Sequence, residues 1–198
     1  MPYPYLLMHP NIPKPLHGMP PRTLKDSKWW TQTKAKAKAK FNACWSCGVS
    51  PSQAKFRKWL EAHECYSIDF NTGATEYIGT SALCHFCHNF IHDGRMLALL
   101  QKGEISERYY LSILAHGNTL LKDWLGLKTP FIKRPFQPND PFCFHPDWRT
   151  IPKSKPLEWK FNPNLPEANW EDYHLILEGK RYERKHEAFP DWQAFYGN

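Results

Sequence analysis

The stretch ALCHFCHNFIHDG, residues 82–94, contains two cysteines and three histidines within nine consecutive positions. Its cysteines, Cys84 and Cys87, have the same C-x-x-C spacing as Cys44 and Cys47, and 36 residues separate the two pairs. Two such pairs supply four thiolates, which can bind one ion tetrahedrally with zinc–sulfur bonds of about 2.3 Å. The N-terminal residues lack the features of a secretory signal, so the pattern predicts a structural zinc ion rather than disulfides.

The segment between the two cysteine pairs predicts a β-hairpin. Residues rich in β-branched and aromatic side chains lie on both sides of the turn signal NTG, with Asn71 and Gly73 in the turn. A helix is expected from Cys87 onward, and Gly94 is expected to end or bend it. The segment from the first cysteine pair to Gly94 is therefore predicted to form two strands followed by a helix.

Three histidines are candidates for a second metal site. His88 and His92 are four residues apart, which places them on one face of the expected helix. Because that helix begins at a zinc ligand, its position is fixed, as a metal or catalytic site requires. The hairpin brings His63 near the strand end that leads into Cys84, which makes His63 the best third ligand. His85, inside the knuckle, is expected to be structural or to face a phosphate.

Outside the zinc-binding part, the chain predicts further helices and irregular arms. Helices are expected from Asp26 or Ser27 to about Phe41 and from Ser106 to Leu125, the second interrupted near Gly117 and Asn118. Cys65 and Cys143 are expected to be ordinary thiols. The expected parts are an extended N-terminal arm (1–26), a zinc-binding domain with flanking helices (27–126), an irregular linker or wrapping segment (127–167), and a hairpin around Gly179 with a short helix (168–198).

Composition and charge favour a nucleic-acid partner and argue against a membrane. The chain has 198 residues, a formal charge of +7 and a pI of about 9.1, and a cationic excess suits phosphates. No run of 18 apolar residues exists, so no membrane span is expected and the protein is expected to be cytoplasmic. The 18 prolines and 15% aromatic residues predict irregular arms that are suited to wrapping a protein partner.

The sequences CWSCG (44–48), LEAHE (60–64) and LCHFCHNFIH (83–92) together resemble the HNH endonuclease family. The resemblance covers roughly residues 42 to 95. It implies an α+β fold with a small zinc-stapled ββα-metal core, here with helical additions and proline- and aromatic-rich arms. It also implies hydrolysis of nucleic-acid phosphodiester bonds with one catalytic divalent ion, Mg²⁺, Mn²⁺, Ni²⁺ or Zn²⁺, besides one structural Zn²⁺.

The family pattern assigns roles to individual residues. It makes His63, His88 and His92 ligands of the catalytic ion and places Glu64 at the position of the general base. Family members carry an asparagine about five residues before the second cysteine pair, where this chain has Gly79. The sequence therefore predicts a metal-dependent endonuclease with His63, Glu64 and His88 as catalytic residues. The alternative is an inactive HNH-like zinc module that binds nucleic acid or a protein partner.

Basic residues around this core are candidates for phosphate contacts, with DNA the expected substrate. Arg57 and Lys58 are the better candidates because they directly precede the strand that carries His63. Lysines of the 27–41 helix and an arginine of the 87–99 region complete the set: Lys36, Lys40 and Arg95. A solvated helix face is the alternative interpretation for the two helix lysines.

Overall fold

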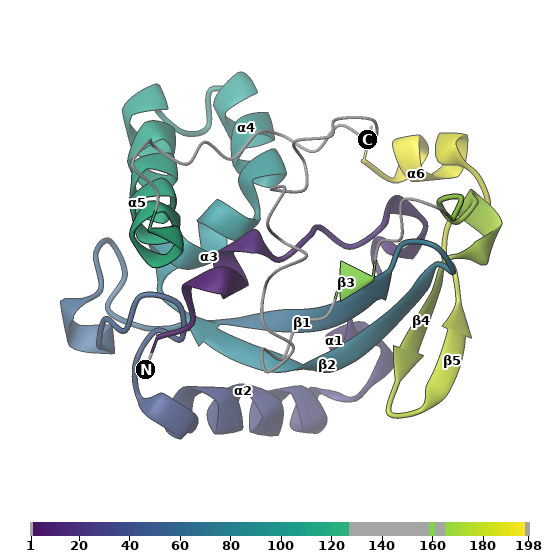
Figure 1. Cartoon of the computed structure of the whole chain (residues 1–198), viewed down its shortest axis with the longest axis horizontal. Helices are drawn as coiled ribbons and strands as arrows, with labels where there is room; N and C mark the ends of the chain where they lie inside the picture. Colours follow the sequence, from purple (N-terminus) through teal and green to yellow (C-terminus); the bar gives the residue numbers. More distant parts are fainter. Residues whose placement is uncertain (1, 127–158, 161–164, 197–198) are drawn as a thin grey trace. The chain divides into compact units, whose positions relative to one another are not determined.

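The computed structural model describes residues 2–126, 159–160 and 165–196, and these form an α+β structure (Figure 1). The expected linker, 127–167, lies almost entirely outside the described residues, as does Cys143. The α-helices among the described residues are α1 (Pro21–Leu24), α2 (Ser27–Phe41), α3 (His85–Ile91), α4 (Asp93–Gln101), α5 (Glu107–Leu125) and α6 (Phe189–Tyr196). The strands are β1 (Glu61–Asp69), β2 (Ala74–Leu83), β3 (Trp159–Lys160), β4 (His174–Leu177) and β5 (Lys180–Glu183).

The described strands form one sheet in the order β3-β1-β2-β4-β5. The hairpin predicted around NTG is present as β1 and β2, which run side by side in Figure 1. The carboxylate of Asp69 accepts a hydrogen bond from the backbone N–H of Asn71 at 3.0 Å, which fixes the turn. Gly73 has φ +73°, and a Cβ there would lie 2.6 Å from the carbonyl carbon of Asp172. The turn therefore requires glycine for both its conformation and its space.

The remaining strands extend the hairpin on both sides. Backbone pairing joins β1 to β3 in parallel and β2 to β4 in parallel, with Ala74 opposite His174. The C-terminal hairpin expected around Gly179 is present as the antiparallel pair β4 and β5, and the short helix after it is α6.

The two long helices predicted from sequence are present. The carboxylate of Asp26 accepts a hydrogen bond from the N–H of Trp29 at 2.6 Å, where α2 begins. Ser106 caps α5 in the same way through Tyr109, at 3.3 Å. The expected interruption of α5 at Gly117 was wrong. A Cβ at Gly117 would lie 2.2 Å from the ring of Phe90, so this glycine allows close packing of α3 against an unbroken α5.

The helix expected from Cys87 onward begins two residues earlier, at His85, and is divided at His92, two residues before Gly94. α3 ends at Ile91, His92 adopts φ −88° and ψ 38°, and α4 begins at Asp93. The N–H of His92 still donates to the carbonyl of His88, at 3.2 Å. The i, i+4 relation between the two histidines is therefore kept across the bend.

Residues 2–26 form short helices instead of the expected extended arm. These are the 3₁₀ helices η1 (Pro4–Met8) and η2 (Lys14–Leu16), followed by α1. Each has proline at its first or second position, where the missing N–H is tolerated. Tyr5, Leu6 and Leu7 are buried, and η1 packs against α3 and α5. Burial of these apolar side chains explains why the segment is folded.

The chain divides into two compact units, and each is assembled from three separated segments. Unit 1 comprises residues 1–9, 38–63 and 82–155, and unit 2 comprises 10–37, 64–81 and 156–198. The sequence had instead predicted successive domains along the chain. Among the described residues, no helix has the length and apolar character needed to cross a membrane.

Candidate metal centre

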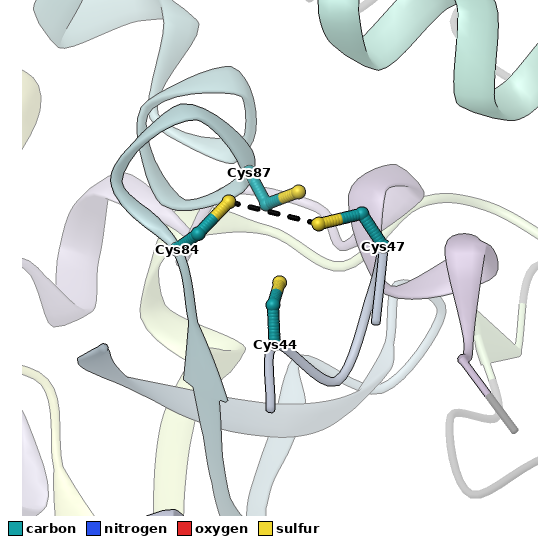
Figure 2. A group of neighbouring side chains, drawn as sticks. All are labelled: Cys44, Cys47, Cys84 and Cys87. Carbon is teal, nitrogen blue, oxygen red and sulfur yellow. Dashed lines mark hydrogen bonds between the residues drawn. The ribbon is translucent and has the colours of Figure 1, made fainter. Parts of the chain in front are cut away.

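The four cysteines predicted to bind zinc converge in unit 1. Figure 2 shows their sulfurs pointing toward one another, from the knuckle loop that carries Cys44 and Cys47, from Cys84 and from α3, which carries Cys87. All four sulfurs lie within 4.8 Å of one another, and those of Cys47 and Cys84 are 3.8 Å apart. Tetrahedral zinc–sulfur bonds of about 2.3 Å place sulfurs about 3.8 Å apart, so the set fits zinc.

Local backbone geometry explains how the knuckle forms. The N–H of Gly48 donates to the carbonyl of Cys44 at 2.8 Å, and Gly48 adopts φ +78°. The N–H of Trp45 donates to the carbonyl of Ala82 at 2.9 Å, which ties the knuckle to the end of β2. These two contacts bring the first cysteine pair to the second.

The charge state of the thiols also fits a cation. Hydrogen bonding led by Cys44 lowers the pKa of Cys84 and raises that of Cys47. The crowded sulfurs thus resist carrying four negative charges by themselves, and a divalent ion removes that conflict. Nε2 of His116 lies 3.4 Å from the Cys87 sulfur, so a proton on this nitrogen would donate to Cys87 in its thiolate form.

The three histidines predicted to share a second ion also converge. One ring nitrogen each from His63, His88 and His92 lies within 4.8 Å of the others. Their ring centroids are 4.8 to 5.4 Å apart. His63 is only 4% exposed, whereas His88 and His92 are partly exposed. Three imidazoles with a solvent-accessible side are the ligand set of an open metal site.

A carboxylate that sequence reasoning missed orients this set. Glu61 accepts hydrogen bonds from Nδ1–H of His88 and Nδ1–H of His85, both at 2.6 Å. With Nδ1 of His88 protonated, its Nε2 is left as the nitrogen available to a metal. Burial opposes ionisation of Glu61, but the hydrogen bonds from His85 and His88 outweigh it and hold the pKa of Glu61 well below its usual range.

The network continues from Glu61 to the surface of unit 1. Nε2 of His85 accepts a hydrogen bond from the hydroxyl of Tyr109 at 2.5 Å. His85 is therefore a structural link between Glu61 and α5, which is one of the two roles that the sequence left open. The signal for Glu61 was available in the sequence: it lies two residues before His63 on a strand, and alternate residues share a face.

A fourth histidine, His9, also lies beside the cluster. It is buried, and its ring centroid is 5.2 Å from that of His63 in an edge-on arrangement. No local pattern pointed to His9, because its position depends on how η1 packs against α3 and α5.

Glu64, the residue at the predicted base position, has a different environment. It is buried and forms an ion pair with Arg22. Successive side chains of a strand point to opposite faces, so Glu64 and His63 diverge from β1. The catalytic role of Glu64 stays a prediction.

The predicted phosphate-contacting residues all have solvent access. Lys36, Lys40, Lys58 and Arg95 are exposed and Arg57 is partly exposed. Lys40 lies over the ring of Trp45 at 4.8 Å, and Arg57 pairs with Glu61 at 3.4 Å. Cys65 is a buried thiol that donates to Ser81 at 3.5 Å, as expected of a structural cysteine.

No protein-family model, curated protein or solved structure matches the chain.

Proposed function

We propose that the protein is a metal-dependent endonuclease of the HNH type, which hydrolyses phosphodiester bonds of nucleic acid. The observation that carries this proposal is the convergence of His63, His88 and His92 beside a four-cysteine knot. The order of β1, β2 and α3 around the two sets suits a ββα-metal core. Four thiolates fill every position of a tetrahedral ion, as in structural sites, whereas three imidazoles leave one position for water or substrate.

The protein's own residues would prepare the site in defined ways. His63, His88 and His92 would hold the catalytic ion, and Glu61 keeps His88 in the tautomer that offers Nε2. A divalent ion bound there would stabilise negative charge on the phosphate and on the leaving oxygen. Imidazole ligands suit Zn²⁺ or Ni²⁺ better than Mg²⁺, which favours oxygen ligands.

The proposed reaction is hydrolysis by water. Water attacks phosphorus and gives one proton to a base, for which Glu64 is the candidate. The bond from phosphorus to the leaving sugar oxygen then breaks, and that oxygen takes a proton from solvent. Glu64 pairs with Arg22 and points to the face of β1 opposite His63, so both the ion pair and the strand would have to shift for its carboxylate to accept this proton.

A second function is favoured by that same ion pair. The carboxylate of Glu64 is paired with Arg22, and position 79 carries glycine instead of the asparagine of the family pattern. Both features are expected of a zinc-binding module that does not cleave nucleic acid. Such a module would bind nucleic acid or a protein partner and would need only the zinc held by the four cysteines.

Plasmid nicking separates the two functions. The 198-residue chain is depleted of the weakly held ion, keeps its cysteine-bound zinc, and is resupplied with Mg²⁺, Mn²⁺, Ni²⁺ or Zn²⁺. We expect nicking of supercoiled plasmid that depends on the added ion and is lost in His88→Ala, which retains one zinc per chain. If no ion restores nicking to zinc-loaded protein, the noncatalytic module is the correct function. Retained nicking in Glu64→Gln would assign proton acceptance to another group.

A further inference from the structure

The five residues KFRKW, 55–59, form a loop between the 3₁₀ helix η3 (Pro51–Gln53) and β1. We call it the basic-aromatic loop. Its flanking residues Ala54 and Leu60 are buried, so both ends are anchored in unit 1. Between these anchors, Phe56 is 68% exposed and Trp59 is 53% exposed. Phe56 is the most exposed large apolar side chain among the described residues, and Trp59 lies three residues from it on the same anchored loop.

The ring of Phe56 is supported by two side chains of unit 1. It stacks on His85 with centroids 4.9 Å apart and planes 14° apart, and it contacts Tyr109 at 5.0 Å. Its backbone has φ +70°, a conformation that non-glycine residues rarely adopt. One face of the ring therefore rests on a buried histidine while the ring remains largely exposed. The supporting His85 is hydrogen-bonded to Glu61, which also orients His88 of the proposed metal site.

Positive charge surrounds the two rings. Lys55 and Lys58 are exposed, and the guanidinium of Arg57 lies 5.3 Å from the centre of the Trp59 ring. Three of the five loop residues are cationic. This charge favours a polyanion over an apolar protein surface as the occupant, because an apolar partner would have to desolvate the lysines.

Flat exposed rings next to cations match the chemistry of an unpaired nucleic-acid strand. In a duplex the bases are stacked inside and present only their edges, whereas unpaired bases offer their faces to aromatic side chains. We propose that the basic-aromatic loop binds unpaired nucleotides, with Phe56 and Trp59 stacking on bases and Lys55 and Lys58 contacting phosphates. The inference rests on the proposed function and names its substrate class: single-stranded nucleic acid, or a strand with unpaired nucleotides.

Binding of labelled oligonucleotides to the zinc-loaded 198-residue chain tests the proposal. Fluorescence anisotropy is measured with a DNA strand, the RNA strand of the same sequence, and the corresponding DNA duplex. We expect a single strand to bind at least about 10-fold more tightly than the duplex. The loss of one base–aromatic stack in Phe56→Ala or Trp59→Ala should weaken single-strand binding by about 5- to 150-fold.

Matched variants keep the test specific. Phe56→Tyr and Trp59→Phe retain a ring and should bind within about threefold of the wild type. Leu111→Ala removes an exposed apolar side chain of α5, 51% exposed, and should change nothing. Lys55→Ala and Lys58→Ala should each reduce the salt dependence of single-strand binding by about 0.7 in logarithmic slope. Zinc content and circular dichroism confirm that each variant is folded.

Two results would overturn the inference: equal affinity for duplex and single strand, or unchanged single-strand affinity in folded Phe56→Ala and Trp59→Ala. The plasmid assay distinguishes this failure from failure of the proposed function. Ion-dependent nicking without a single-strand preference removes only the inference. If single strands bind through the two rings but no nicking occurs, the nuclease proposal fails and the loop remains a binding site for unpaired nucleotides.

Discussion

At the scale of single residues, Glu61 links His88 of the proposed metal site to two neighbouring side chains. It holds both His85 and His88 through short hydrogen bonds and also pairs with Arg57. A carboxylate that accepts a hydrogen bond from a metal-binding histidine fixes the ring and increases its basicity, and Glu61 is placed to do this for His88 in the proposed site. The geometry thus assigns Glu61 a positioning role that does not depend on contact with substrate.

Glu61→Gln should weaken binding of the second ion by about 10- to 100-fold, because the amide cannot accept two hydrogen bonds from imidazole as well as a carboxylate does. Titration of the zinc-loaded protein with Co²⁺, followed by absorbance and calorimetry, measures this affinity. Glu104→Gln, a change of an exposed glutamate in the same unit, is the control and should bind Co²⁺ like the wild type. Unchanged affinity in Glu61→Gln would show that His88 is oriented by other contacts.

At the scale of secondary-structure elements, the packing of α3 against α5 depends on the absence of a side chain at one position. Gly117→Ala would place its Cβ 2.2 Å from the ring of Phe90, and Phe90 is fully buried. We expect the free energy of unfolding to fall by about 1–3 kcal/mol, the usual cost of overpacking a core.

Gly94→Ala is the matched control for this prediction, since a Cβ at Gly94 meets nothing within 4 Å. Alanine is a better helix former than glycine by about 1 kcal/mol, so this variant should be neutral or more stable. Urea unfolding of both variants with saturating zinc gives the comparison. Similar stabilities for the two variants would mean that Phe90 can move aside at little cost.

The docking of α6 onto η2 in unit 2 should depend on pH through His17. Its Nε2–H donates to the carbonyl of Ile12 at 2.8 Å, and its Nδ1 accepts from the indole N–H of Trp192 at 2.9 Å. Burial lowers the pKa of His17, and the neighbouring His186 and Lys14 lower it further. Protonation of Nδ1 would remove the acceptor for Trp192.

The sign of this effect follows from the lowered pKa. As the pH falls, the unfolded chain takes up a proton on His17 near pH 6.5, before the folded chain does. His17 therefore makes its full contribution to the free energy of unfolding only above that pH. This contribution is lost as the pH falls through the pKa that His17 has in the folded chain. NMR titration should give His17 a pKa below 6.5, and the protection factors of the α6 amides, which are corrected for the intrinsic pH dependence of exchange, should fall in acid. His17→Gln should remove this part of the pH dependence. A measured pKa above 6.5 would contradict the prediction.

At the scale of the whole molecule, the cysteine knot joins two distant segments of unit 1. Cys44 and Cys47 belong to the 38–63 segment, whereas Cys84 and Cys87 belong to the 82–155 segment. Structural zinc contributes about 10–16 kcal/mol of apparent binding free energy in zinc-finger peptides, which is as large as the stability of most domains. The folding of unit 1 should therefore depend on zinc.

We expect the four cysteines to bind zinc. Its removal with a strong chelator should then abolish the cooperative unfolding transition of unit 1, and added Zn²⁺ should restore it. Cys84→Ser should behave like the chelated protein. His88→Ala should keep one zinc per chain and its transition, because it affects only the second ion. The measurements are metal content, near-ultraviolet circular dichroism and thermal unfolding. An unchanged transition after confirmed loss of zinc would show that the apolar core alone holds unit 1 together.

The sequence by itself determined the local features of this protein. C-x-x-C spacing, the NTG turn and the caps at Asp26 and Ser106 depend on interactions between residues a few positions apart, so they can be read from a short stretch. The convergence of His63 with His88 and His92 also followed, because a tight hairpin connects them. In contrast, only the tertiary structure decided the placement of His9, the ion pair of Glu64 with Arg22, and the fit of Phe90 against Gly117. Each of these depends on packing between segments far apart in the chain, and no local pattern encodes which distant surfaces will meet.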